Sequence, residues 1–133
     1  MNTSPRLRLL ATTVLVLLAS LIGFTGCTHV EVAPGALGEF KFGELQVFVD
    51  RDFTTAYNAA KTAGKDLNLF QTQDDKKVIE ADLHFRDSTD TLVIVKIKEV
   101  GNRRTSIKIR YGISPQGSLP LSQKHFQAIQ RHL

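Results

Sequence analysis

Apolar and polar residues alternate along three stretches in the second half of the chain. Lys77–Phe85, Thr91–Val100 and Arg104–Tyr111 each carry apolar side chains at every second position. This is the period of a strand that buries one face. Residues 88–90 and 101–103 connect the stretches and have the composition of hairpin loops. The pattern predicts an antiparallel meander.

The loop lengths also predict a register, because a slip of one residue would turn the apolar set to water. One face of the predicted meander pairs Leu83 with Val95 and Ala81 with Ile97, and it pairs Ile97 with Ile107 and Val95 with Ile109. The other face then carries three rows: Glu80, Lys98 and Ser106; Asp82, Lys96 and Lys108; and His84, Ile94 and Arg110.

Upstream, residues 39–49 alternate as a strand, with a bulge or bend expected at Gly43. Apolar residues then recur every three or four positions from Phe53 to Leu67, after Asp52 as a helix N-cap. A polar turn is expected at 71–75, and a second helix from Leu119 or Ser122 to Leu133. The sequence therefore predicts one α+β domain over residues 39–133. We expect a curved antiparallel four-stranded sheet with two helices on one face, in the order β-α-β-β-β-α.

The N-terminal region has the layout of an export signal. Arg6 and Arg8 precede an uncharged run, Leu9–Phe24, and the small residues Thr25 and Gly26 precede Cys27. Residues 24–27 resemble the lipobox of bacterial lipoproteins. The resemblance implies that residues 1–26 form a lipoprotein signal peptide cleaved between Gly26 and Cys27. Cys27 would then carry a diacylglycerol and an acyl chain that hold the protein at the membrane.

Three other interpretations of this region stay open: a secretory signal that leaves Cys27 as a free thiol, a retained membrane anchor and, least favoured because the run is apolar on every side, a buried core helix. The apolar run is shorter than the ~20 residues of a typical span. Residues 27–38 are expected to be the lipidated cysteine and a flexible spacer, because they contain Pro34, Gly35 and Gly38 without a period. Thr28, rather than aspartate, follows Cys27. By resemblance to enterobacterial sorting, this favours the outer membrane, facing the periplasm.

Several short segments also resemble a family of small uncharacterised bacterial lipoproteins, defined as a domain of unknown function. They are Phe42-Gly43-Glu44-Leu45, Ala56-Tyr57-Asn58-Ala59-Ala60 and Ile107-Lys108-Ile109-Arg110-Tyr111-Gly112, followed by Ser122 before the last helix. The resemblance runs from Phe42 nearly to Leu133. It implies an envelope location and an α+β fold, but no substrate.

Charge and cysteine content narrow the function classes. The 17 Lys and Arg barely exceed the 13 Asp and Glu, and Arg6 and Arg8 lie in the segment that cleavage would remove. A nucleic-acid partner is therefore not expected, since such proteins carry a strong basic stripe. The chain has one cysteine, so no disulfide can form within it.

The face of the predicted meander opposite the core offers a candidate site. Most of it is expected to be solvated and crossed by weak ion pairs. At one end, however, His84, Leu92, Ile94 and Arg110 combine apolar area with a basic group, which is typical of a partner patch. An envelope protein is the expected partner. Asp82 and His84 alone are too few ligands for zinc, so we expect no metal and no cofactor.

No arrangement of residues indicates catalysis. The chain has no Gly-x-Ser-x-Gly elbow, and Asp74 and Asp75 stand beside Lys76 and Lys77 in a predicted charged turn. We therefore expect a non-enzymatic binding or scaffold domain. The alternatives are an enzyme accessory and a small-molecule carrier. A carrier would have a pocket between helices and sheet, lined by Phe53, Tyr57, Phe126 and Ile129.

Overall fold

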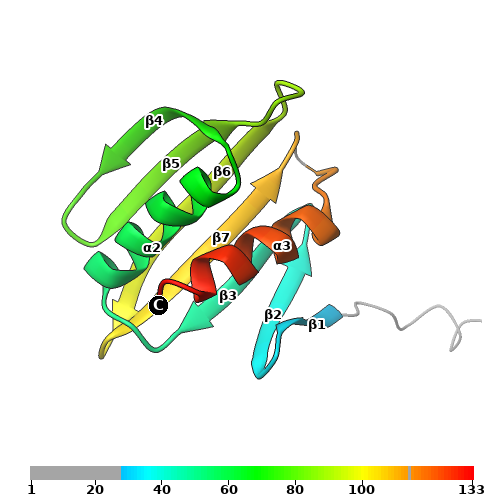
Figure 1. Cartoon of the computed structure of the whole chain (residues 1–133). Helices are drawn as coiled ribbons and strands as arrows, with labels where there is room; N and C mark the ends of the chain where they lie inside the picture. Colours follow the sequence, from blue (N-terminus) through cyan, green and yellow to red (C-terminus); the bar gives the residue numbers. More distant parts are fainter. Residues whose placement is uncertain (1–27, 114) are drawn as a thin grey trace, which may run out of the picture.

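The computed structural model describes residues 28–113 and 115–133, which form a seven-stranded antiparallel sheet and two helices. The strands lie in the order β1-β2-β3-β7-β6-β5-β4, and both helices lie on one face of the sheet (Figure 1). The strands are β1 (Thr28–Ala33), β2 (Ala36–Lys41), β3 (Glu44–Val49), β4 (Phe70–Lys76), β5 (Glu80–Arg86), β6 (Leu92–Gly101) and β7 (Arg104–Tyr111). The helices are α2 (Phe53–Asp66) and α3 (Leu119–Gln130).

The expected four-stranded sheet with the order β-α-β-β-β-α is wrong, because the described chain forms three further strands. The expected spacer, residues 28–38, forms β1 and the beginning of β2. Pro34 and Gly35 make the turn between these strands, and Gly35 has a φ of 77°. Two α3 side chains hold β1 in place: Gln123 and Gln127 each donate a hydrogen bond of 3.1 Å to its backbone carbonyls.

The expected strand of residues 39–49 is also divided. Phe42 and Gly43 have φ angles of 50° and 76° and form a tight turn between β2 and β3 rather than a bulge within one strand. The polar segment expected as a turn at 71–75 lies inside β4, an edge strand that pairs with β5. The sequence pattern did not show β4 because the exposed residues of an edge strand need no apolar period.

The register predicted for the last three strands is confirmed. Leu83 pairs with Val95 and Ala81 with Ile97, while Ile107 and Ile109 pair with Ile97 and Val95 on the other side of β6. These residues lie on the helix-covered face and are buried. The alternation of apolar and polar residues therefore sets which face of the meander forms the core.

The two helices begin at side-chain caps and pack closely on the sheet. Asp52 accepts a hydrogen bond of 3.1 Å from the Thr55 backbone, and Ser118 caps α3 in the same way. A Cβ on Gly64 would lie 2.6 Å from the Phe85 ring, so only glycine lets α2 approach β5 this closely. The largest fully buried side chains of the core include Leu45, Leu83, Phe85, Ile97, Ile107, Ile109, Phe126 and Ile129.

Candidate functional site

The face of the sheet opposite the helices, here called the open face, carries polar side chains. The three rows predicted across β5, β6 and β7 are confirmed by the strand pairing. The middle row continues across all seven strands as His29, Glu39, Gln46, Lys108, Lys96, Asp82 and Asp75. This row is therefore a continuous polar band across the open face in the described part of the chain.

Two hollows lie on the open face. The first, of about 480 Å³, is lined by residues of β3 to β7, including Lys96, Lys98 and Ser106. The second, of about 360 Å³, extends over β2, β3 and β7. Gln46 and Lys108 line both hollows, so the two meet at the middle of the sheet.

The charges on the open face are unevenly paired. Lys108 lies 3.4 Å from Glu44, and Lys98 and Lys77 lie 3.8 and 3.0 Å from Glu80. The hydrogen bond from Lys77 lowers the pKa of Glu80. Lys96 stands opposite Lys108 in the ladder, yet no described carboxylate lies within 4.0 Å of its ammonium. Asp82 is the other ladder neighbour of Lys96 but forms no ion pair with it within 4.0 Å, so the Lys96 ammonium can still gain from an anionic group that approaches it.

The structure brings the predicted partner patch together but does not expose its apolar part. Ile94 pairs with Arg110 on one side and His84 on the other, as the register predicted. Ile94 is only 8% exposed, however, while His84, Leu92 and Arg110 are half-buried. The Arg110 Nε is buried without a hydrogen-bond partner among the described residues. Arg110 also lines the second hollow, so this part of the predicted patch joins the hollows on the open face.

The predicted lipidation and cleavage residues, Cys27 and Gly26, lie outside the described residues. β1 begins at Thr28, directly after the cysteine. Neither α2 nor α3, the helices of the described part, is both long enough and apolar enough to cross a membrane.

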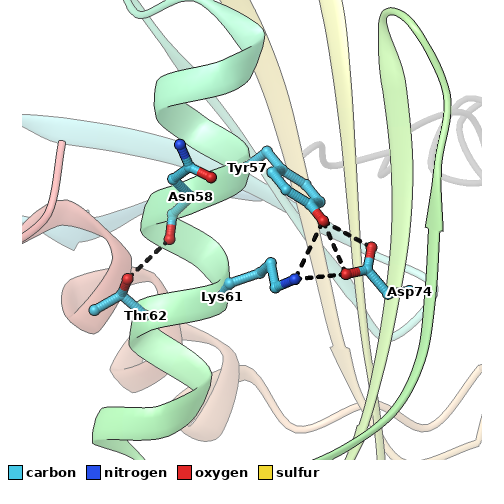
Figure 2. A network of polar contacts seen from close by, with 5 residues as sticks. All are labelled: Tyr57, Asn58, Lys61, Thr62 and Asp74. Carbon is cyan, nitrogen blue, oxygen red and sulfur yellow. Dashed lines mark hydrogen bonds and ion pairs between the residues drawn. The ribbon is translucent and has the colours of Figure 1, made fainter.

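A second polar cluster lies on the other side of the sheet, between α2 and the edge strand β4. Figure 2 shows Tyr57 and Lys61 of α2 reaching Asp74 of β4. The Tyr57 hydroxyl donates to the carboxylate at 2.8 and 2.9 Å, and the Lys61 ammonium lies 2.7 Å from the same group. We call these three residues the clasp, because they join the exposed edge strand to the helix.

The pKa shifts in the clasp oppose acid–base catalysis. Two effects raise the pKa of Tyr57: the larger is partial burial, and the smaller is the hydrogen bond to Asp74. A tyrosine that exchanges protons near neutral pH needs a lowered pKa. Burial acts to raise the pKa of Asp74, but the hydrogen bonds from Lys61 and Tyr57 lower it overall. The clasp is therefore an ionised structural contact, and sequence reasoning missed it because Asp74 was expected in a turn.

A family model described as "Protein of unknown function (DUF3568)" matches residues 8–132. The chain belongs to the DUF3568 family. The match extends over nearly the whole chain, so the open face and the clasp both lie within the family domain. The match agrees with the expected membership of an uncharacterised family, and the description of the family names no activity. No curated protein matches the chain.

The core of this DUF3568 domain contains a histidine that the sequence analysis did not single out. The His125 Nδ1 lies 2.9 Å from the Tyr111 hydroxyl, and its Nε2 is buried without a hydrogen-bond partner among the described residues. Burial lowers the pKa of His125 to about 4 and raises the pKa of Tyr111 to about 12. The spacing to Ser122 and Ile129 could have placed His125 on the buried face of α3.

The remaining candidate residues of this DUF3568 domain lie in the core and on the open face. The four residues proposed to line a carrier pocket, Phe53, Tyr57, Phe126 and Ile129, are buried members of the core cluster. Phe53 and Tyr57 stack with their ring centroids 6.0 Å apart. Within the described residues, Asp82 and His84 are not part of any group of three or more metal-ligating side chains.

Proposed function

We propose that this chain is a lipid-anchored lipoprotein of the bacterial cell envelope that binds a partner through its open face and catalyses no reaction. The partner is an envelope protein that brings an acidic group to Lys96. The outer membrane, facing the periplasm, is the favoured location.

The sequence supports the anchor. A basic start, an uncharged run and two small residues stand before the single cysteine in the order expected of a lipoprotein signal. Cleavage before Cys27 would release a chain whose first described strand begins at Thr28. Lipid on that cysteine would hold a small domain at the membrane, because two or more acyl chains give stable anchoring.

The main support for binding is that the helices cover one face of the sheet and leave the other face uncovered. The helices and the core occupy one face, so the polar hollows on the other contribute little to the fold. Lys96 projects from the middle of this open face without a carboxylate partner in the described part of the chain. Complementary charge steers partners and sets their orientation. An acidic partner would remove the like-charge repulsion between Lys96 and Lys108.

The polar groups on the helix-covered side support a non-enzymatic role. Burial and the hydrogen bond to Asp74 raise the pKa of Tyr57, while hydrogen bonds from Lys61 and Tyr57 lower the pKa of the partly exposed Asp74. Neither direction brings the group closer to proton transfer near neutral pH. His125 is sealed in the core beside Tyr111. No observation favours the enzyme accessory or the carrier with a pocket between helices and sheet.

The anchor is tested by mass spectrometry of the protein isolated from its natural membranes. The expected result is a mature chain that begins at Cys27 and carries a diacylglycerol and an acyl chain. The variant Cys27→Ser should appear in the soluble fraction. An unmodified Cys27, or a chain that keeps residues 1–26, would contradict the anchor.

The binding face is tested by charge reversal with a matched control. The double variant Lys96→Glu and Lys98→Glu changes two exposed lysines of the open face. The control, Lys65→Glu and Lys124→Glu, makes the same charge change on the exposed sides of α2 and α3. Co-purification of an acidic envelope protein should be lost in the first variant and kept in the second. Equal effects in both would contradict a role for the open face.

A further inference from the structure

The position of β1 limits how far the domain can stand from a lipidated cysteine. This inference rests on the proposed lipidation of Cys27. Consecutive Cα atoms lie about 3.8 Å apart, and Thr28 already pairs with Phe40 of β2. No spacer therefore separates the proposed anchor from the sheet. The end of the sheet at which the chain enters β1 must lie at the membrane surface.

β1 is a fixed part of the domain. Its Val32 is buried in the core, and α3 holds its backbone through Gln123 and Gln127. Because β1 cannot swing freely, its attachment point also sets which end of the sheet faces the lipid. We call this end the anchor end.

The anchor end carries two exposed apolar side chains on neighbouring loops. β2 runs antiparallel to β1, so its end and the turn at Phe42 extend about two residues, or ~7 Å, beyond the level of Thr28. Phe42 is 73% exposed. A Cβ on Gly43 would lie 2.4 Å from the Pro115 carbonyl oxygen, which shows that this turn touches the loop before α3. That loop carries Ile113, which is 82% exposed.

The surroundings of Phe42 suit a lipid headgroup region. The Lys41 ammonium lies 5.4 Å from the centroid of the Phe42 ring. An aromatic ring beside an exposed basic residue is typical of side chains at a membrane interface. A lipid tether keeps these side chains close to the bilayer, so even weak insertion contributes to orientation.

From this geometry we propose that the anchor end rests on the bilayer, with Phe42 and Ile113 inserted at the level of the lipid headgroups. The open face then stands at an angle to the membrane, where it meets partners held close to the lipid surface. The turn between β4 and β5 lies at the opposite end of the sheet (Figure 1). This turn contains Val78, which is 90% exposed. The proposed orientation therefore places Val78 in water, although it is an aliphatic residue at least as exposed as Ile113.

Single-tryptophan fluorescence tests this orientation, because the chain contains no native tryptophan. Phe42→Trp, Ile113→Trp and the control Val78→Trp are prepared as full-length acylated proteins. Each is reconstituted into vesicles of phosphatidylethanolamine and phosphatidylglycerol, with and without brominated acyl chains. All three positions are exposed, and circular dichroism verifies that each variant is folded.

The proposal expects a blue shift and strong quenching by the brominated lipid for Phe42→Trp and Ile113→Trp, and neither effect for Val78→Trp. Acylated, vesicle-bound protein with solvent-like emission at positions 42 and 113 overturns the proposed orientation alone. Quenching that is equal at all three positions overturns it as well. Absence of acylation on Cys27 overturns the proposed anchor, and the orientation with it.

Discussion

The two faces of the sheet are built from the same strands, but one is packed in the core and the other is left uncovered by the helices. On β7, Ile109 faces the helices and is fully buried, whereas its neighbour Lys108 faces the open side and stands between Gln46 and Lys96. Alternation along a strand separates the two sets of side chains at every step. A sheet with one covered face can therefore vary its other face for binding without disturbing its core.

The largest effect should come from the covered face. Ile109→Ala removes a fully buried side chain, so the free energy of unfolding should fall by about 2–5 kcal/mol. Lys108→Ala removes only a half-exposed ion pair with Glu44 and should cost at most about 1 kcal/mol. Urea denaturation of both variants measures the difference. Equal losses would mean that the open face also carries the fold.

Acid should weaken the covered face through His125. Its pKa is about 4 in the folded chain and near 6.5 when unfolded, so only the unfolded chain takes up this proton between those values. The neutral, buried His125 contributes about 3 kcal/mol to the free energy of unfolding. This contribution is complete above pH 6.5 and is lost as the pH falls toward 4.

Urea denaturation as a function of pH measures this loss. His125→Gln should flatten the dependence of stability on pH in that window. The contribution of His125 would be disproved if His125→Gln kept the full dependence.

A smaller loss of stability is expected from Gly64→Ala. Alanine favours a helix over glycine by up to about 1 kcal/mol. The new Cβ, however, would lie 2.6 Å from the buried Phe85 ring, and overpacking of this kind costs about 1–3 kcal/mol. The net change should therefore be destabilising, as measured by the shift in thermal midpoint. Thr62→Ala on the exposed side of α2 is the control and should be neutral or stabilising.

The clasp should have the smallest effect on global stability. Asp74→Asn weakens a partly exposed ion pair with Lys61, so the loss should stay below about 1 kcal/mol. Locally, hydrogen exchange of the β4 amides should accelerate, since the edge strand loses its connection to α2. Unchanged exchange in β4 would show that pairing with β5 alone holds the strand.

Elements with one buried face could be predicted from the sequence. The register of the meander and the cap of α2 at Asp52 followed from period and spacing, and both are confirmed. In these elements the burial of apolar side chains selects a single arrangement. The local pattern of apolar and polar residues was therefore enough to predict them.

The two edge strands could not be predicted in this way. β4 has the sequence FQTQDDK and is exposed almost throughout, so pairing with β5 and the clasp hold it rather than an apolar face. β1 lacks a period because a bulge between Glu31 and Ala33 interrupts its alternation. The turn at Phe42 was missed because a bulky residue is uncommon at a positive φ.

The candidate site was predicted only in part. The sequence placed His84, Ile94 and Arg110 in one row, and the strand pairing confirms this. The sequence could not show that Ile94 would be buried. The exposure of a residue on an open sheet face depends on whether the long side chains of its neighbours cover it. Nor could the sequence show the two hollows, because the second is lined by β2, which was not predicted as a separate strand, and the first reaches Asp75 of β4, which was expected in a turn.

Photo-crosslinking in living cells tests most directly whether the open face is the binding face. A benzophenone amino acid replaces Lys98, which is exposed on the open face, in one variant and Lys124, on the exposed side of α3, in the other. We expect a discrete adduct with an acidic envelope protein from position 98 that disappears when Lys96 is also changed to Glu, and no such adduct from position 124. The same adduct from position 124, or an adduct from position 98 that persists with Lys96→Glu, would contradict the proposed binding face.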